Sequence, residues 1–150
     1  MQFSTRARYG LRALLDISLH GDEKPVLLKD IQVRQEISKP YLEQILLILQ
    51  SAGFIRSIRG KNGGFFLARS PSEIKLIEVI KALERTISFV ECVSNPQMCL
   101  RSDHCATQEL WRRLTKILYR ELQSLTLEDL VRWQRENWKF NRSKRIGKKS

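Results

Sequence analysis

The amino-acid sequence predicts a mainly α-helical chain that contains one small β-hairpin. Apolar residues recur at intervals of three and four through much of the chain, which is the period of an amphipathic helix. Two short runs rich in aromatic and β-branched residues, 55–59 and 65–67, flank the glycine-rich segment 60–64, as in a hairpin. The 150 residues include 42% apolar and 29% charged side chains, which is ordinary for a globular domain with its own core.

The charge gives the first indication of a partner. The formal net charge is +11 at pH 7, and such a surplus favours a polyanion, either nucleic acid or an anionic membrane surface. Two stretches, 51–72 and 137–150, contain no acidic residue. No apolar run approaches the ~20 residues of a membrane span, and the N-terminus lacks a secretory signal. We therefore expect a cytoplasmic protein without a membrane segment.

Three helices are predicted in the first third of the chain. The first covers about residues 5–20 and the second covers 28–35. The third begins after Ser38, which suits the N-cap, has Pro40 in its first turn and ends near Ala52. Its core-facing stripe has helical spacing and consists of Leu42, Ile45, Leu46 and Leu49.

A basic hairpin follows, and then a fourth helix over about residues 73–83. Two short helices joined by a tight turn, followed by a basic hairpin, predict a winged helix-turn-helix domain over residues 1–85. The glycine-rich tip is not a Walker loop, because no Gly-Lys-Ser/Thr follows at the required spacing and no helix starts after it. The alternatives are an ordinary core helix and a tight hairpin without a function.

The third helix and the hairpin have the chemistry to read DNA. A helix fits the major groove and presents its first turn to base edges, where Gln44 can pair with adenine and Glu43 can accept from cytosine. The hairpin can place a cation in the adjacent groove. The predicted DNA-binding residues are Ser38, Lys39, Tyr41, Glu43, Gln44, Arg59 and Lys61.

All three cysteines, Cys92, Cys99 and Cys105, lie in the segment 86–106. An odd number of thiols argues against a disulfide framework. Thiolates ligate iron–sulfur clusters, and the Cys-x6-Cys-x5-Cys spacing is longer than the usual zinc spacing. The spacing favours a loop folded around a cluster, and zinc, a bare thiol sensor and the absence of a function remain alternatives.

Two helices are expected after the cysteines, over residues 107–138, and a basic disordered tail over 139–150. Thr126 and Asp129 form a capping pattern for the last helix. The preceding long helix has more apolar residues than a small winged domain needs, so we expect it to pair with its copy in a homodimer. Its apolar stripe consists of Leu110, Leu114, Ile117, Leu118 and Leu122.

The chain resembles the IscR/NsrR-type family of bacterial winged-helix transcription regulators, in its iron–sulfur branch. The segments that carry the resemblance are STRARYG at 4–10, ISKPYLEQ at 37–44, SIRGKNGGF at 57–65, the triple-cysteine loop, ELW at 109–111 and TLEDL at 126–130. Together they cover about residues 1–135. The resemblance implies a homodimer that binds a palindromic double-stranded DNA operator through the residues matching Ser38, Glu43, Gln44 and Arg59.

The resemblance also implies a 2Fe–2S or 4Fe–4S cluster held by Cys92, Cys99 and Cys105. Members that use a fourth ligand take a histidine three residues after the third cysteine, where this chain has Gln108, or an N-terminal acidic residue, where it has Arg8. We expect a weakly held fourth position, filled by a carboxylate, water or a small thiol. Cluster-free relatives regulate cysteine metabolism, which leaves a thiol- or metabolite-responsive regulator as the alternative.

A third possibility belongs to another class, a nonspecific binder of anionic membranes or other polyanions that uses the basic tail. No Ser-His-Asp set, paired carboxylates or nucleotide-binding fingerprint stands out, so the sequence gives no support to an enzyme.

Overall fold

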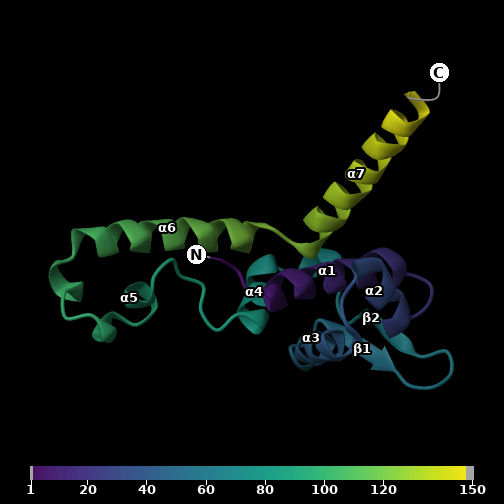
Figure 1. Ribbon diagram of the computed structural model, residues 1–150, viewed down its shortest axis with the longest axis horizontal. Coiled ribbons are helices and arrows are strands. Elements are labelled where there is room, and N and C mark those ends of the chain that lie inside the picture. The colour runs from purple at the N-terminus through teal and green to yellow at the C-terminus, as the bar shows by residue number, and fades with distance from the viewer. Residues whose placement is uncertain (1, 148–150) are drawn as a thin grey trace.

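The computed structural model describes residues 2–147 and confirms a mainly helical fold with one antiparallel hairpin. Its winged body lies at one end of an elongated molecule, with α6 and the cysteine segment extending as an arm and α7 rising on another side (Figure 1). The helices are α1 (Thr5–His20), α2 (Leu28–Gln35), α3 (Lys39–Ser51), α4 (Leu76–Leu83), α5 (Glu91–Ser94), α6 (Ala106–Ser124) and α7 (Leu127–Gly147). The strands are β1 (Ile55–Ile58) and β2 (Gly64–Leu67).

The core lies between α1, α3 and α4. The predicted stripe of α3 is buried in full, with Leu42, Ile45 and Leu49 at 0% exposure and Leu46 at 1%. Burying such side chains stabilises the fold by about 1.5–3 kcal/mol each. The helices α1 and α4 approach closely at Gly10, where an added Cβ would lie 2.5 Å from Leu83 Cδ1.

An ion-pair network joins α1 to α2. The Asp16 carboxylate is 1% exposed and accepts from Arg34 Nη2 at 2.7 Å and from Arg34 Nε at 2.9 Å. Gln35 Nε2 donates to the same carboxylate at 2.8 Å. The hydrogen bond to Asp16 raises the pKa of Arg34 above its ordinary value. This network fixes the first helix of the helix-turn-helix on α1.

One residue of the connection between α1 and α2, Val26, forms an isolated β-bridge with the wing hairpin. Ile55 pairs with Leu67 and Ile58 with Gly64, so β1 and β2 form the predicted hairpin. Val26 extends the sheet by exchanging backbone hydrogen bonds with Phe65 at 2.7 and 2.8 Å. An added Cβ at Gly64 would lie 2.5 Å from the Val26 carbonyl oxygen, so this close approach requires glycine.

Two predicted boundaries were wrong. The fourth helix begins at Leu76 rather than near residue 73, because Pro71–Glu73 forms a separate 3₁₀ turn closed by a Ser70–Glu73 capping box. The tail was expected to be disordered, but residues 139–147 continue α7 as a helix, while residues 148–150 lie outside the described residues. None of the described helices is long and apolar enough to cross a membrane.

Candidate nucleic-acid interface and thiol loop

The N-terminal face of α3 presents exposed polar side chains. Ser38 occupies the N-cap, as predicted, but its hydroxyl makes no capping bond. An N-cap side chain accepts from the second or third helical N–H; Pro40 stands second and has none, and the third, the Tyr41 N–H, makes no such bond here. Within residues 2–147, neither Glu43 nor Gln44 takes part in a side-chain hydrogen bond or ion pair, and both are exposed. This face is therefore available to a partner.

Tyr41 differs from the other predicted DNA-binding residues of α3. Its ring packs edge-on against Tyr9 of α1, with centroids 5.9 Å apart and planes at 71°. The Arg12 guanidinium lies over the other ring of the pair, 5.2 Å from the Tyr9 centroid. Tyr41 is half-buried by this packing, which fixes α3 on α1.

The wing tip places two cations in solvent. Arg59 and Lys61 are both exposed, and the Gly63 N–H closes the turn by donating to the Gly60 carbonyl at 3.0 Å. The hairpin and α3 lie on the same side of the body, away from α7 (Figure 1). The structure thus brings α3 and the hairpin, the two elements that carry the predicted DNA-binding residues, to one side of the molecule (Figure 1).

The three thiols lie on three successive short elements. Cys92 is in α5, Cys99 follows the 3₁₀ turn Pro96–Met98, and Cys105 is the N-cap of α6. All three are free and half-buried. Among residues 2–147, no group of three or more His, Cys, Asp or Glu side chains lies close enough together to hold a metal ion. The structure therefore does not bring the predicted ligands into one group.

The Cys105 thiol has a distinctive environment. Its Sγ lies 3.1 Å from Thr107 Oγ1, and a hydrogen bond from that hydroxyl lowers the pKa of Cys105. The backbone N–H of Gln108 lowers it further. Both effects stabilise the thiolate, which is the form that binds metal. The residue adjacent to it, His104, is exposed at the end of the 3₁₀ turn Ser102–His104.

Gln108, which stands at the position that the resemblance gives to a fourth ligand, is a structural residue of the loop. Its side chain is 2% exposed. Nε2 donates to the Cys92 carbonyl at 2.8 Å and to Ser102 Oγ at 3.1 Å, and Oε1 accepts from Arg112 at 3.3 Å. Thr115, two turns later on the same side of α6, is also a buried polar residue. Two polar residues at this helical spacing were the sequence signal that could have indicated a hydrogen-bonded role for Gln108.

The apolar stripe of α6 divides into two parts. Leu118 and Leu122 pack against the chain's own core. Leu110 and Ile117 face solvent, at 49% and 58% exposure. This second part is an apolar surface on an arm that extends from the body (Figure 1).

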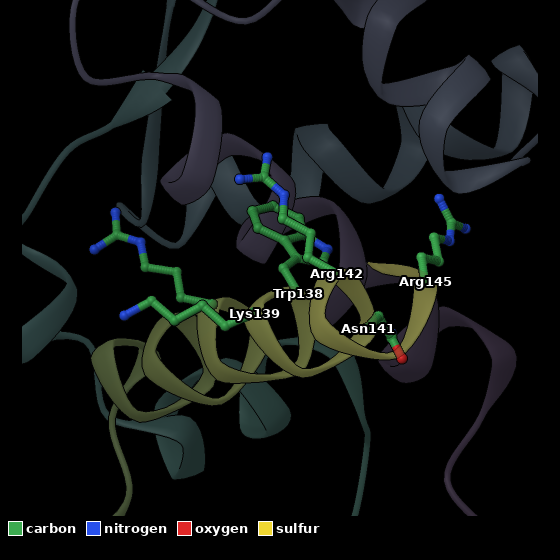
Figure 2. Close-up of a pocket in the computed structure, with 6 residues that line it drawn as sticks. Trp138, Lys139, Asn141, Arg142 and Arg145 are labelled. Carbon is green, nitrogen blue, oxygen red and sulfur yellow. The ribbon is translucent and has the colours of Figure 1, made fainter. Parts of the chain in front are cut away.

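A cationic face runs along α7. Figure 2 shows Trp138, Lys139, Arg142 and Arg145 extending from one side of this helix. With Arg135 and Asn141 they line an open cavity of about 560 Å³. In the described part of the chain, none of these cations forms an ion pair with an acidic side chain. Trp138 also lies against His20 at the end of α1, with ring centroids 6.4 Å apart.

Comparisons with known proteins agree on one family. Residues 3–133 match the Rrf2 family, described as iron-dependent transcriptional regulators. The protein rrf2 of Nitratidesulfovibrio vulgaris is 44% identical over 132 residues, which is 88% of each chain. The HTH-type transcriptional regulator IscR of Photorhabdus laumondii is 40% identical over 131 residues, 87% of this chain and 79% of that protein.

Solved structures show the same similarity. CymR, the global cysteine regulator of B. subtilis, has a TM-score of 0.77 and 36% identity over 89% of this chain and 98% of its own. IscR of T. potens has a TM-score of 0.75 and 35% identity over 91% of this chain and 90% of its own. These relatives are regulators of transcription and not enzymes. The chain therefore belongs to the Rrf2 family and is an IscR-type DNA-binding transcriptional regulator.

Proposed function

We propose that this regulator binds a palindromic operator as a homodimer, with α3 in the major groove and the wing in the adjacent groove of each half-site. The observation that carries the proposal is the exposed N-terminal face of α3, whose polar side chains have no partner within residues 2–147. A two-fold dimer matches a two-fold DNA site, one half-site for each subunit.

Within each half-site, the roles follow from the chemistry of the side chains. Gln44 can make two hydrogen bonds to adenine, and Glu43 accepts from the cytosine amino group. Glu43 also repels phosphate, so it contributes discrimination rather than affinity. The uncapped Ser38 hydroxyl and the Lys39 ammonium are available at the helix end that approaches the DNA. Tyr41 keeps α3 at its angle to α1 through the contact with Tyr9.

The wing adds cations on the same side of the molecule. Arg59 is proposed to enter the neighbouring groove, and Lys61 to contact phosphates. Arginine suits a narrow groove because its planar guanidinium loses less hydration than an ammonium group. Both side chains are exposed at the tip, where the glycine turn lets the backbone come close to the duplex.

The second copy is proposed to pack on α6. Leu110 and Ile117 form an apolar surface that a partner helix would bury, and Leu114 lies between them on the same stripe. Leu118 and Leu122 are excluded from this seam because they already pack on their own core. The α6 pair then sets the distance between the two α3 helices.

The thiol loop is proposed to hold an iron–sulfur cluster through Cys92, Cys99 and Cys105. The donor set fits: three soft thiols within one short segment, with the thiolate form of Cys105 stabilised by Thr107. Such a cluster supplies redox and ligand-exchange chemistry when it is bound. The loop has to close for the three thiols to meet, and only Ile87 within residues 86–106 is buried in the core, so little packing opposes that movement.

A second candidate, a cluster-free thiol- or metabolite-responsive regulator, is favoured by a specific observation. The three thiols are separate in this structure, and each is half-buried rather than sealed in the core. The structural similarity to a cysteine regulator also supports a cluster-free regulator.

The test of DNA reading is a selection from random DNA, followed by binding of the selected site and of random DNA at about 150 mM salt. Gln44→Ala is expected to weaken the selected site more than random DNA. Gln50→Ala is the matched control, since Gln50 is exposed at the other end of α3. If wild-type protein binds every sequence with equal affinity, the proposal of specific reading is wrong.

The test of the cluster is the visible absorbance of protein purified without oxygen. Each of Cys92→Ala, Cys99→Ala and Cys105→Ala is expected to abolish the spectrum, and His104→Ala to retain most of it. Wild-type protein without visible absorbance that still binds its operator would favour the cluster-free regulator.

A further inference from the structure

Gln108 links the parts of the thiol loop. Its amide nitrogen reaches the carbonyl of Cys92 at 2.8 Å and the hydroxyl of Ser102 at 3.1 Å. Ser102 lies between Cys99 and Cys105, and its backbone N–H donates to the Cys99 carbonyl at 3.1 Å. Gln108 itself stands in the first turn of α6, whose N-cap is Cys105. A single carboxamide thus contacts or adjoins the segments of all three cysteines.

The partners of Gln108 engage its amide within the protein. Both hydrogens of the amide nitrogen are used within the loop, and the lone pair of that nitrogen is delocalised into the carbonyl and so is not offered to a metal. The amide oxygen accepts from Arg112 Nη2 at 3.3 Å. The side chain is 2% exposed, so a lost bond would leave a buried polar group unsatisfied rather than hydrated.

We infer that Gln108 is a positioning residue for the thiol loop, which orders the segments of Cys92, Cys99 and Cys105 around the start of α6 and thereby sets their shared affinity for a soft metal centre. This inference rests on the proposed function of the loop. Its physical basis is preorganisation: a loop already tied to α6 loses less conformational entropy when its thiols close on a common centre. Arg112 holds the amide in its orientation.

Two substitutions of Gln108 distinguish a residue that positions the loop from one that binds the metal. Gln108→Ala removes all three bonds. Gln108→Glu keeps the length of the side chain and its acceptor for Arg112, but loses the donor to the Cys92 carbonyl. A carboxylate is a better metal ligand than an amide, so a ligand role would make Gln108→Glu bind metal more tightly. A positioning role makes both substitutions weaken binding.

The experiment titrates the metal-free full-length protein with Cd²⁺ alone and follows the thiolate-to-cadmium absorption. Gln108→Ala and Gln108→Glu are each expected to weaken binding by about 5- to 100-fold, the range expected for the two amide-donor hydrogen bonds that both variants lose, without moving the absorption band. Ser102→Ala should weaken binding less, and its effect should shrink in the Gln108→Ala background, where the bond from the Ser102 hydroxyl to the Pro96 carbonyl at 2.6 Å remains. Gln123→Ala and Gln123→Glu are the controls, because Gln123 is exposed near the other end of α6.

Three outcomes would overturn the inference. The first is tighter Cd²⁺ binding by Gln108→Glu, and the second is a displaced absorption band in Gln108→Ala. The third is an unchanged Cd²⁺ affinity of Gln108→Ala together with a lower melting temperature, which is the result expected if Gln108 only stabilises the fold. Failure of the proposed loop function gives a different result: Cys92→Ser, Cys99→Ser and Cys105→Ser would each bind Cd²⁺ with the affinity of the wild type. In that case the alkylation rate of Cys92 in the metal-free protein tests whether Gln108 positions the loop. A positioning role requires that Gln108→Ala raise this rate, and an unchanged rate refutes the role.

Discussion

The Arg34–Asp16 pair is expected to be essential for the orientation of the helix-turn-helix. Arg34→Ala removes two hydrogen bonds from a carboxylate that is 1% exposed and leaves Gln35 as its side-chain donor. Breaking a fully buried pair costs about 3–5 kcal/mol, because the remaining charge has no partner. The Arg34 side chain is 35% exposed, so solvent screens part of the interaction. We therefore expect a loss of about 2–3 kcal/mol in the free energy of unfolding.

Urea unfolding of the metal-free protein measures this loss as a shift of the midpoint. Arg34→Lys should recover part of it, since an ammonium keeps the charge but not the two-pronged contact. Arg8→Ala is the matched control, because Arg8 is exposed on α1 and its one side-chain bond is to Thr5 at 3.3 Å. The reasoning is refuted if Arg34→Ala lies within about 0.5 kcal/mol of the wild type, the usual range of neutral surface changes.

Four further predictions follow from the same structure. Arg59→Ala should cost about 1–3 kcal/mol on the selected DNA site and much less on random DNA, as measured by fluorescence anisotropy; equal losses on both would contradict groove reading. Ile117→Asp should give monomers by light scattering, whereas Lys116→Asp on the neighbouring exposed position should leave the dimer intact. Gly10→Ala should destabilise the protein by about 1–3 kcal/mol in urea, because its methyl group would collide with Leu83, and the loss should shrink in a Leu83→Ala background. Neutralising Arg135, Lys139, Arg142 and Arg145 to Gln tests whether α7 contacts phosphates: since α7 rises on the side away from α3, the slope of log affinity against log salt should change by less than about 0.9, the value of one phosphate contact (Figure 1).

Periodicity was sufficient to predict the body of the fold. The stripe of α3 and the hairpin register depend on local sequence, where apolar spacing and glycine turns leave few alternatives. The capping pattern at Thr126 was also correct, since Asp129 Oδ2 accepts from the Thr126 N–H at 2.8 Å. Where one segment determined the outcome, sequence reasoning succeeded.

With one exception, the features that the sequence did not reveal depend on contacts between distant segments. The Val26 bridge forms because Gly64 lets it approach β2, and the partner of Asp16 lies 18 residues away in α2. The exception is the end of α7, where low apolar content predicted disorder and residues 139–147 continue the helix. The bonds of Gln108 require the loop to turn back on α6, which no pattern in one helix encodes.

The connections of the thiol loop indicate how a signal there could act on DNA. At the start of the loop, the end of α4 is fixed to α1: Arg6 Nε donates to the Leu83 carbonyl at 2.7 Å, and the Ser4 N–H donates to Glu84 Oε1 at 2.5 Å. These bonds and the packing of Gly10 on Leu83 hold α4 to the body that carries α3. At its other end, the loop continues directly into α6, whose first half lies on the arm (Figure 1). Under the proposed function, ordering of the loop would therefore move α6 more readily than α3. Because α6 is the proposed seam between subunits, the signal would change the spacing of two reading helices rather than the shape of either one.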